Sequence, residues 1–331
     1  MSQIITNGQG GFFSNLGMGK GAAVVDAGTD LDLFLSLAGA DYTVTPVQAM
    51  HPITGDPVPG QFFLDRQPGN VVVAPKTVTA NYGVITPSDM AESVRDLVDQ
   101  GWLTPSDFML QKKEGIVGMR EVLAFRLDAQ RKIGDEEDWS FFLLLGNVHG
   151  RGKVTGCIVS NRPRCENQIV GILSSFNWSV SHRVPKADQT VVRARVNDAA
   201  QSWQVLNNKI DAMARKLGLF VDFPMDWNLA LEATNDVLGI PQNADEKEIS
   251  GQKRNNRDAI LAEFNNPTRG TFGKSAFDLY MAATAFLTHG DSTGRIKSKM
   301  PPEGRASGRL SGGLARLEAG MVDTLSAMVA A

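Results

Sequence analysis

The chain has 331 residues, of which 42% are hydrophobic and 21% charged, and a net charge of −3. The composition is close to that of globular proteins and excludes wholesale disorder, and the mild acidity excludes an indiscriminate polyanion binder. No apolar run approaches the roughly 20 residues that a membrane-spanning helix needs, and the N-terminus lacks the basic start and apolar core of a secretory signal.

The first part of the chain alternates between short predicted helices and strands. Residues 1–25 are rich in Gly and Asn, so we expect a loosely ordered N-terminal arm. A helix is predicted from Thr29 to Gly39, and residues 42–49 alternate as a strand does. The Thr-Pro-Ser-Asp sequence at 86–89 predicts a second helix, with Pro at its first position.

Hairpins are predicted in the middle of the chain. Residues 108–127 form one, and the charged link 128–138 is expected to be a solvated loop. Residues 139–169 form the central hairpin, in which two apolar strands flank a Gly-rich turn. Its ends concentrate His, Arg, Lys, Cys and Asn side chains, and such polar groups are costly to bury unless they meet a partner or a ligand.

Helical periodicity dominates after residue 196. The strongest pattern runs from Asn197 to Gly218, and others cover 226–238, 245–264, 274–289 and 310–331. Residues 291–309 are basic and rich in Gly, Pro and Ser, so we expect a flexible loop. Strands followed by helices predict an α+β fold, with an antiparallel sheet built from hairpins in the first half and helices from the second half packed on it. We expect one such domain over 26–290.

Charge is unevenly distributed. Residues 1–110 hold eleven acids and four bases, whereas residues 151–195 hold eight bases and two acids. The basic stripe could follow phosphates, or its bases could pair with the acidic first third. Its eight bases, with Trp178 as a stacking aromatic, are the predicted nucleic-acid-binding residues: Arg151, Lys153, Arg162, Arg164, Arg183, Lys186, Arg193 and Arg195.

The central hairpin carries motifs that are similar to those of a known family. They are Leu-Leu-Leu-Gly-Asn-Val-His-Gly at 143–150, Arg-Pro-Arg-Cys-Glu-Asn at 162–167 and Ser-His at 181–182. The Gly-Thr-Phe-Gly segment at 270–273, followed by His289, also fits. With these motifs the chain resembles the phage/plasmid-like protein family, a family of unknown function. The resemblance implies a gene of phage or plasmid origin, often suspected of roles in DNA replication or recombination.

Three functions remain open. The first is single-stranded DNA binding or annealing by a homo-oligomer, which needs a Lys/Arg groove and stacking aromatics. The second is a structural or assembly protein of a phage. The third is an enzyme that uses His149, Cys165 and His182, because a Cys activated by a neighbouring His is a nucleophile.

The two cysteines, Cys157 and Cys165, suit a reducing compartment and have no metal-binding spacing. We therefore expect a cytoplasmic protein with no membrane contact, no metal and no cofactor.

Overall fold

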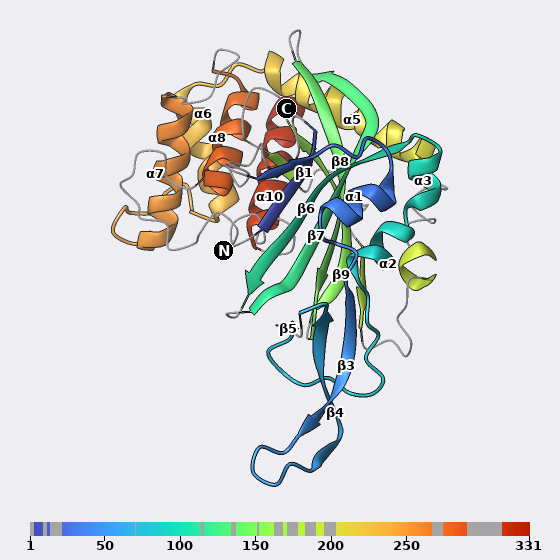
Figure 1. Cartoon of the computed structure of the whole chain (residues 1–331). Coiled ribbons are helices and arrows are strands. Elements are labelled where there is room, and N and C mark those ends of the chain that lie inside the picture. The colour runs from blue at the N-terminus through green and yellow to red at the C-terminus, as the bar shows by residue number, and fades with distance from the viewer. Residues whose placement is uncertain are drawn as a thin grey trace. The chain divides into compact units, whose positions relative to one another are not determined.

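The structure, a computed structural model, describes residues 3–8, 12–13, 22–69, 71–113, 116–133, 137–150, 152–161, 168–170, 178–182, 190–194, 203–266, 274–289 and 313–331. The contacts within the chain form two compact units (Figure 1). Unit 1 comprises Met1–Asp128, Phe141–Ile158 and Ser175–Leu206, and unit 2 comprises Ala129–Ser140, Val159–Ser174 and Asn207–Ala331. The predicted boundaries at 290 and 309 fall outside the described residues, the boundary at 25 falls among described ones, and all three stay predictions.

The main sheet has the strand order β10-β9-β8-β7-β6-β1-β2. Strand β11 is not part of this order and pairs with β9, as β10 does. The strands are β1 (Gln3–Asn7), β2 (Ala23–Val25), β6 (Leu103–Lys113), β7 (Ile116–Ile133), β8 (Glu137–Val148), β9 (Lys153–Asn161), β10 (Gln168–Val170) and β11 (Trp178–Ser181). β1 is antiparallel to β6 and parallel to β2. The sheet is therefore built mainly from consecutive hairpins, as expected.

The link predicted as a charged loop is largely strand. β7 continues to Ile133 and β8 begins at Glu137, so only residues 134–136 separate the two strands. The expectation of a loop over 128–138 is wrong, because a polar run does not prevent strand pairing. The ladder is made by backbone N–H and C=O groups whatever the side chains are.

Part of the predicted N-terminal arm is strand β1, which is fixed to β6 by a buried carboxyl group. Asp107 of β6 is fully buried and accepts hydrogen bonds from the hydroxyl groups of Thr6 and Ser106 and from the backbone N–H of Phe13. Burial raises the pKa of Asp107 to about 6, although these hydrogen bonds oppose the shift. Ile4 and Ile5 of β1 are buried as well, which explains why this segment is ordered.

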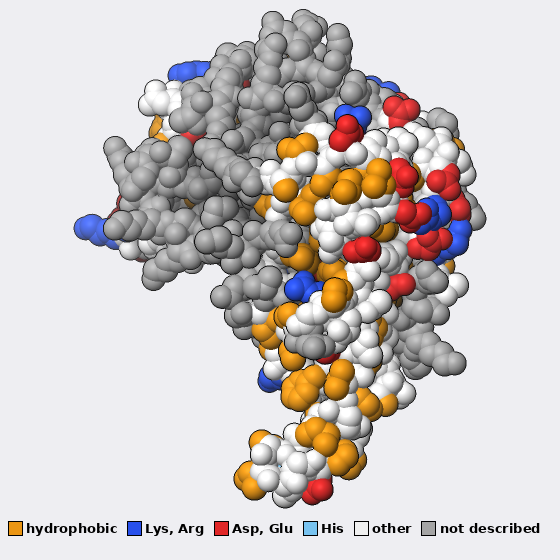
Figure 2. Space-filling view, viewed as in Figure 1, with side chains coloured by type: hydrophobic (Ala, Val, Ile, Leu, Met, Phe, Trp, Pro, Cys, Tyr) orange, Lys and Arg blue, Asp and Glu red, His pale blue; other side chains and the backbone are white. Residues whose placement is uncertain are grey.

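A second, three-stranded sheet in unit 1 consists of β3 (Thr43–Met50), β4 (Pro57–Gln67) and β5 (Val71–Val72). Val47 lies opposite Phe63, and Val72 lies opposite Asp65, so these side chains share one face. Val47, Phe63 and Val72 are 39–45% exposed. Figure 2 shows the apolar side chains gathered on this β3–β4 hairpin.

Unit 1 also contains the short helices α1 (Leu31–Leu37), α2 (Pro87–Glu92) and α3 (Arg95–Asp99). α2 begins with the predicted sequence, since Thr86 and Asp89 form a capping box and Pro87 is the first helical residue. The N-cap of α1 is Asp30, one residue after the predicted start. Residues 190–194 are also helical.

Unit 2 contains the helices of the second half: α5 (Trp203–Asp222) from Asn207 onward, α6 (Trp227–Leu238), α7 (Gly251–Asn265), α8 (Ala276–His289) and α10 (Gly313–Ala330). α8 contacts α7, α10 and strand β10. Its residues Phe277 and Tyr280 are fully buried, and Trp139 meets Phe277 edge to face at 6.1 Å between ring centroids. The α+β class, with strands in the first half and helices in the second, is confirmed.

Candidate functional site

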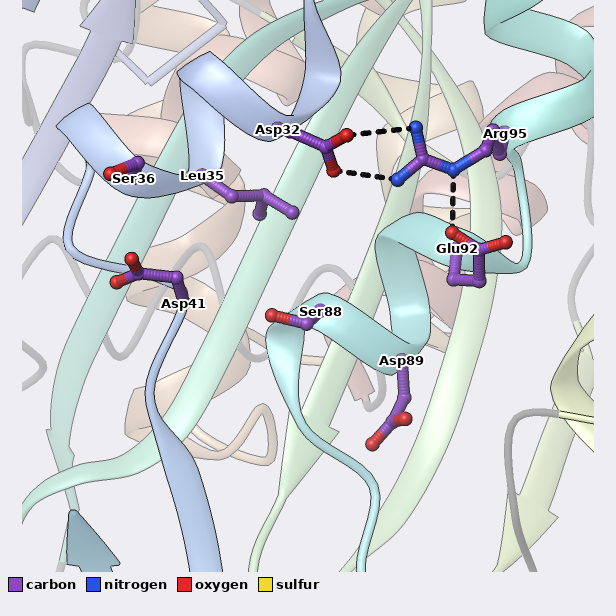
Figure 3. A pocket seen from close by; sticks show the side chains of 8 residues that line it. All are labelled: Asp32, Leu35, Ser36, Asp41, Ser88, Asp89, Glu92 and Arg95. Carbon is purple, nitrogen blue, oxygen red and sulfur yellow. Dashed lines mark hydrogen bonds and ion pairs between the residues drawn. The ribbon is translucent and has the colours of Figure 1, made fainter.

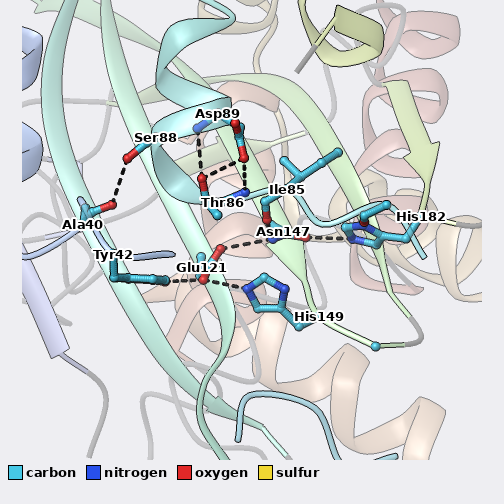
Figure 4. A network of polar contacts seen from close by, with 12 residues as sticks. Ala40, Tyr42, Ile85, Thr86, Ser88, Asp89, Glu121, Asn147, His149 and His182 are labelled. Atoms are coloured by element: carbon cyan, nitrogen blue, oxygen red, sulfur yellow. Dashed lines mark hydrogen bonds and ion pairs between the residues drawn. The ribbon is translucent and has the colours of Figure 1, made fainter. Parts of the chain in front are cut away.

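A buried polar network in unit 1 is centred on Glu121 of β7 (Figure 4). The Glu121 side chain is fully buried and accepts three hydrogen bonds. Tyr42 O–H and His149 Nε2, the latter at 2.8 Å, donate to Oε1, and Asn147 Nδ2 donates to Oε2 at 3.1 Å. The donors come from the segment before β3, the end of β8 and the turn after it, so tertiary packing assembles the site.

Strand register brings these side chains to one face. His149 N donates to Met119 O at 2.9 Å, which sets β7 against the end of β8. Alternate residues of a strand point to the same face, so Asn147 and His149 both face Glu121. The sequence predicted a Gly-rich turn over residues 147–153, and β8 in fact continues to Val148 before the chain turns.

The network extends from Asn147 to His182, which follows β11. His182 Nε2 lies 2.9 Å from Asn147 Oδ1, and Nδ1 lies 2.8 Å from Gly83 O. The backbone N–H of Gly83 donates to His182 O at 3.0 Å, and Tyr82 stacks on the imidazole with ring centroids 4.8 Å apart. His182 therefore fixes the segment before α2 against β11.

Both ring nitrogens of His182 face oxygen acceptors. The amide nitrogen of Asn147 donates to Ile85 O and to Glu121, so the amide oxygen is the atom that faces His182. Only an imidazolium donates to both acceptors. Burial lowers the pKa of His182, whereas the Gly83 carbonyl raises it, so the second proton is bound only under acidic conditions.

Arg66 of β4 supplies a positive charge beside the network. Its guanidinium lies 5.1 Å from the centroid of the Tyr42 ring. The same group lies against Gly118, because a Cβ added to this glycine would be 2.8 Å from Arg66 Nη1. Burial, together with the charge of Glu121, raises the pKa of Tyr42, so the phenol stays protonated and donates to Glu121. A charge can be buried when hydrogen bonds and an opposite charge offset the loss of its hydration. Glu121 has three hydrogen-bond donors and a nearby guanidinium.

One atom of the network has no partner among the described residues. Nδ1 of His149 is buried and makes no hydrogen bond within this part of the chain, whereas Nε2 faces Glu121. Because a carboxylate holds the proton on Nε2, Nδ1 presents a lone pair. A carboxylate-oriented imidazole with a free lone pair can accept a proton or bind a metal. In the part of the chain that the structure describes, no group of three or more His, Cys, Asp and Glu could hold a metal ion.

The predicted Cys/His residues are brought together only in part. His149 and His182 belong to one network, through Glu121 and Asn147. Cys165 lies outside the described residues. Cys157 is buried and its pKa is raised to about 12 by burial, so this thiol is not an activated nucleophile.

The structure describes three of the predicted nucleic-acid-binding residues. Lys153 is exposed at the start of β9, and Trp178 is half-buried on β11, packed against Gly156. Arg193 forms an ion pair with Asp96 at 2.6 Å, so one base of the stripe pairs with the acidic first third. The other six lie outside the described residues: Arg151, Arg162, Arg164, Arg183, Lys186 and Arg195.

The sequence interpretation missed Glu121, Tyr42 and Tyr82. Glu121 sits in the alternating run of β7, where its position among the apolar residues Met119 and Leu123 was an available signal for a buried charge. Nothing in the sequence near Tyr42 or Tyr82 indicates a contact with residues so distant along the chain.

A surface pocket of about 450 Å³ lies at α1, α2 and α3 (Figure 3). It is lined by Asp32, Leu35, Ser36, Asp41, Ser88, Asp89, Glu92 and Arg95. Arg95 pairs with Asp32 at 2.6 Å and with Glu92 at 2.5 Å, and its hydrogen bond lowers the pKa of Asp32. Asp89 belongs to the capping box of α2. These three carboxylates therefore serve ion pairing and helix capping.

Most of the chain is similar to a described protein family. Residues 75–312, well over half of the chain, match a family model described as a domain of unknown function, DUF932. No curated protein and no solved structure matches the chain. Among the described residues, no helix is long and apolar enough to cross a membrane.

Proposed function

The chain belongs to the DUF932 family, a domain family of unknown function, and we propose from its own side chains that it binds single-stranded DNA. In this proposal it is a phage or plasmid protein of the host-cell cytoplasm that acts as a homo-oligomer in annealing during recombination or replication. The match fits the expected family of unknown function, and phage or plasmid origin stays a prediction.

The proposal is carried by the polar face of the β9–β11 strand pair. Lys153 lies opposite Ser181, and Thr155 lies opposite Ser179, so the four side chains share one face of an antiparallel ladder. Lys153 and Ser179 are exposed. Lysine and hydroxyl side chains are common contacts to phosphate and sugar, and they bind the backbone without reading sequence.

An aromatic residue lies on the other face of the same strand pair. Trp178 is opposite Gly156, and a Cβ at Gly156 would lie 2.3 Å from the indole ring. Because β11 pairs with β9 alone among the described strands, a bound strand that bends around this edge could reach both the lysine and the half-exposed indole. Stacking on an aromatic tolerates any base and suits annealing.

The experiment is fluorescence anisotropy with a labelled oligo(dT), from low to physiological salt, with duplex DNA as the control. We expect tight binding that prefers the single strand and weakens steeply with salt, because neutralised phosphates release counterions. Trp178→Ala should weaken binding, whereas Trp227→Ala, at an exposed tryptophan of unit 2, should leave it unchanged. No binding even at low salt would refute the proposal, and oligomers that form without DNA would favour the assembly alternative.

A second candidate, an enzyme, is favoured by the unpartnered Nδ1 of His149. In this reading the imidazole oriented by Glu121 is a general base. The labelled oligonucleotide serves as substrate, and cleavage products are sought across pH. Cleavage that is lost in His149→Gln and kept in His51→Gln, at an exposed histidine, would support it. Cleavage that persists in His149→Gln would exclude this base.

A further inference from the structure

Three adjacent strands of the main sheet place one residue each in a lateral row. A Cβ at Gly146 of β8 would lie 3.1 Å from Thr155 Oγ1 of β9 and 4.0 Å from Val122 Cγ2 of β7. The Thr155 hydroxyl also donates to Gly146 O at 3.4 Å. Thr155, Gly146 and Val122 therefore lie side by side on the same face.

Two basic residues occupy the next row of that face. Arg120 precedes Val122 by two residues on β7, and Lys153 precedes Thr155 by two on β9, so both share the face of their neighbours. β7 and β9 each form a hairpin with β8, so they run parallel to each other and the two bases are displaced in the same direction. With one strand between them, their backbones are about 10 Å apart.

Arg120 is a half-buried cation that has no counter-charge among the residues that the structure describes. Burial lowers its pKa. Within the described part of the chain its guanidinium forms no hydrogen bond or ion pair. Arg95 and Arg257, in contrast, pair with carboxylates that raise their pKa.

The acidic groups nearest along these strands are committed elsewhere. Glu121, the next residue of β7, points to the opposite face and binds Tyr42, Asn147 and His149. Asp107 of β6 is opposite Ala124, which is four residues from Arg120. Its carboxyl group already accepts hydrogen bonds from Thr6, Phe13 and Ser106.

We propose that Arg120 and Lys153 form a phosphate-binding site on this face of the sheet, with the exposed Ser179 hydroxyl beside it. The ligand class is a phosphate polyanion, and its assignment to single-stranded DNA rests on the function proposed above. A guanidinium binds phosphate oxygens through two parallel N–H donors, and the bound anion supplies the charge partner that Arg120 lacks within the described part of the chain. The sequence interpretation placed Lys153 in the basic stripe but did not single out Arg120.

The test uses the full chain with Arg120→Gln, Lys153→Gln and the double variant. Arg126→Gln is the matched control, since it removes the same charge from an exposed position of β7, six residues further along the strand. In oligo(dT) titrations against salt, each lost phosphate contact should lower the slope of log K against log[salt] by about 0.7. The double variant should therefore lose about 1.4 and the control nothing.

Stability separates this site from a structural role. Removing an unpaired, desolvated charge should raise the denaturation midpoint of ligand-free Arg120→Gln above that of the wild type. A guanidinium that holds the fold together would lower the midpoint instead, and that result would overturn the site. Arg120→Lys keeps the charge and serves as the second variant if the glutamine disturbs folding.

Tripolyphosphate in a thermal-shift assay separates the two proposals. If oligo(dT) binds the wild type and the double variant equally, the site is wrong and the proposed function stands. If oligo(dT) does not bind but tripolyphosphate stabilises the wild type and Arg126→Gln, and not the double variant, the phosphate site stands and the DNA function falls. If neither ligand acts on any variant, both fall.

Discussion

Arg120 and Glu121 are consecutive residues of β7 that point to opposite faces of the main sheet and have opposite electrostatic surroundings. Glu121 is fully buried and receives three hydrogen bonds. Arg120 is half-buried, and burial lowers its pKa. On one face of the strand, the Glu121 carboxylate is hydrogen-bonded within the protein. On the other face, the Arg120 guanidinium is the group that we propose pairs with a bound anion.

Glu121→Gln should destabilise the protein more than Tyr42→Phe. The amide would turn an N–H₂ group toward the Asn147 amide, so two donors would face each other in a buried site. We expect a loss of about 2–3 kcal/mol in the free energy of unfolding, against about 1 kcal/mol for the lost phenol donor. Urea denaturation of both variants measures the difference, and equal losses would contradict the central position of Glu121.

Asp107 should give the protein a pH-dependent stability between about pH 4 and pH 6. Its folded-state pKa, about 6, is above the ordinary value of 3.8, so the folded state binds this proton more tightly than the unfolded state. The contribution of Asp107 is therefore most favourable at acidic pH and is lost as pH rises through 6, by about 3 kcal/mol in total.

Asp107→Asn should remove this dependence, because its amide N–H₂ can donate to the Thr6 hydroxyl while its oxygen accepts from Phe13 N–H. Denaturation curves at pH 4 to 7 compare it with wild type and with Asp56→Asn, an exposed control. A variant that keeps the wild-type slope over this range would show that Asp107 is not the responsible group.

Gly156→Ala should displace the Trp178 side chain. The added Cβ would lie 2.3 Å from the indole, which is closer than any non-bonded contact permits, so the ring must move. We expect a loss of about 1–3 kcal/mol in stability. In a double-mutant cycle with Trp178→Ala, the glycine substitution should cost much less once the ring is gone. Additive effects would mean that the two residues are not in contact.

Cys157 should be protected from thiol reagents in the folded protein. It is buried and its pKa is raised to about 12, so little thiolate is present near neutral pH. In a Cys165→Ser variant, Cys157 is the single thiol, and its labelling by a disulfide reagent at pH 8 should be as slow as unfolding. Fast labelling under native conditions would contradict the burial of this residue.

The α+β class and the central hairpin were predictable because they depend on local patterns. Apolar runs on either side of a Gly-rich turn mark β8 and β9, and spacings of three and four mark the helices of unit 2. Thr86 and Asp89 specify a helix start through contacts within four residues. The sequence interpretation failed between β7 and β8, where it read charged residues as a loop although backbone pairing is indifferent to them.

The candidate site was predictable only as residue types. The sequence alone identified His149 and Lys153 as polar side chains at the ends of one hairpin, and His182 as part of a motif that follows it. Only the tertiary structure decided that Glu121 and Tyr42 complete the network around His149, and that Arg120 joins Lys153 on the opposite face. The reason is physical: alternation along a strand fixes which residues share a face, but strand register and order fix which residues of different strands meet, and both depend on contacts distant in the chain.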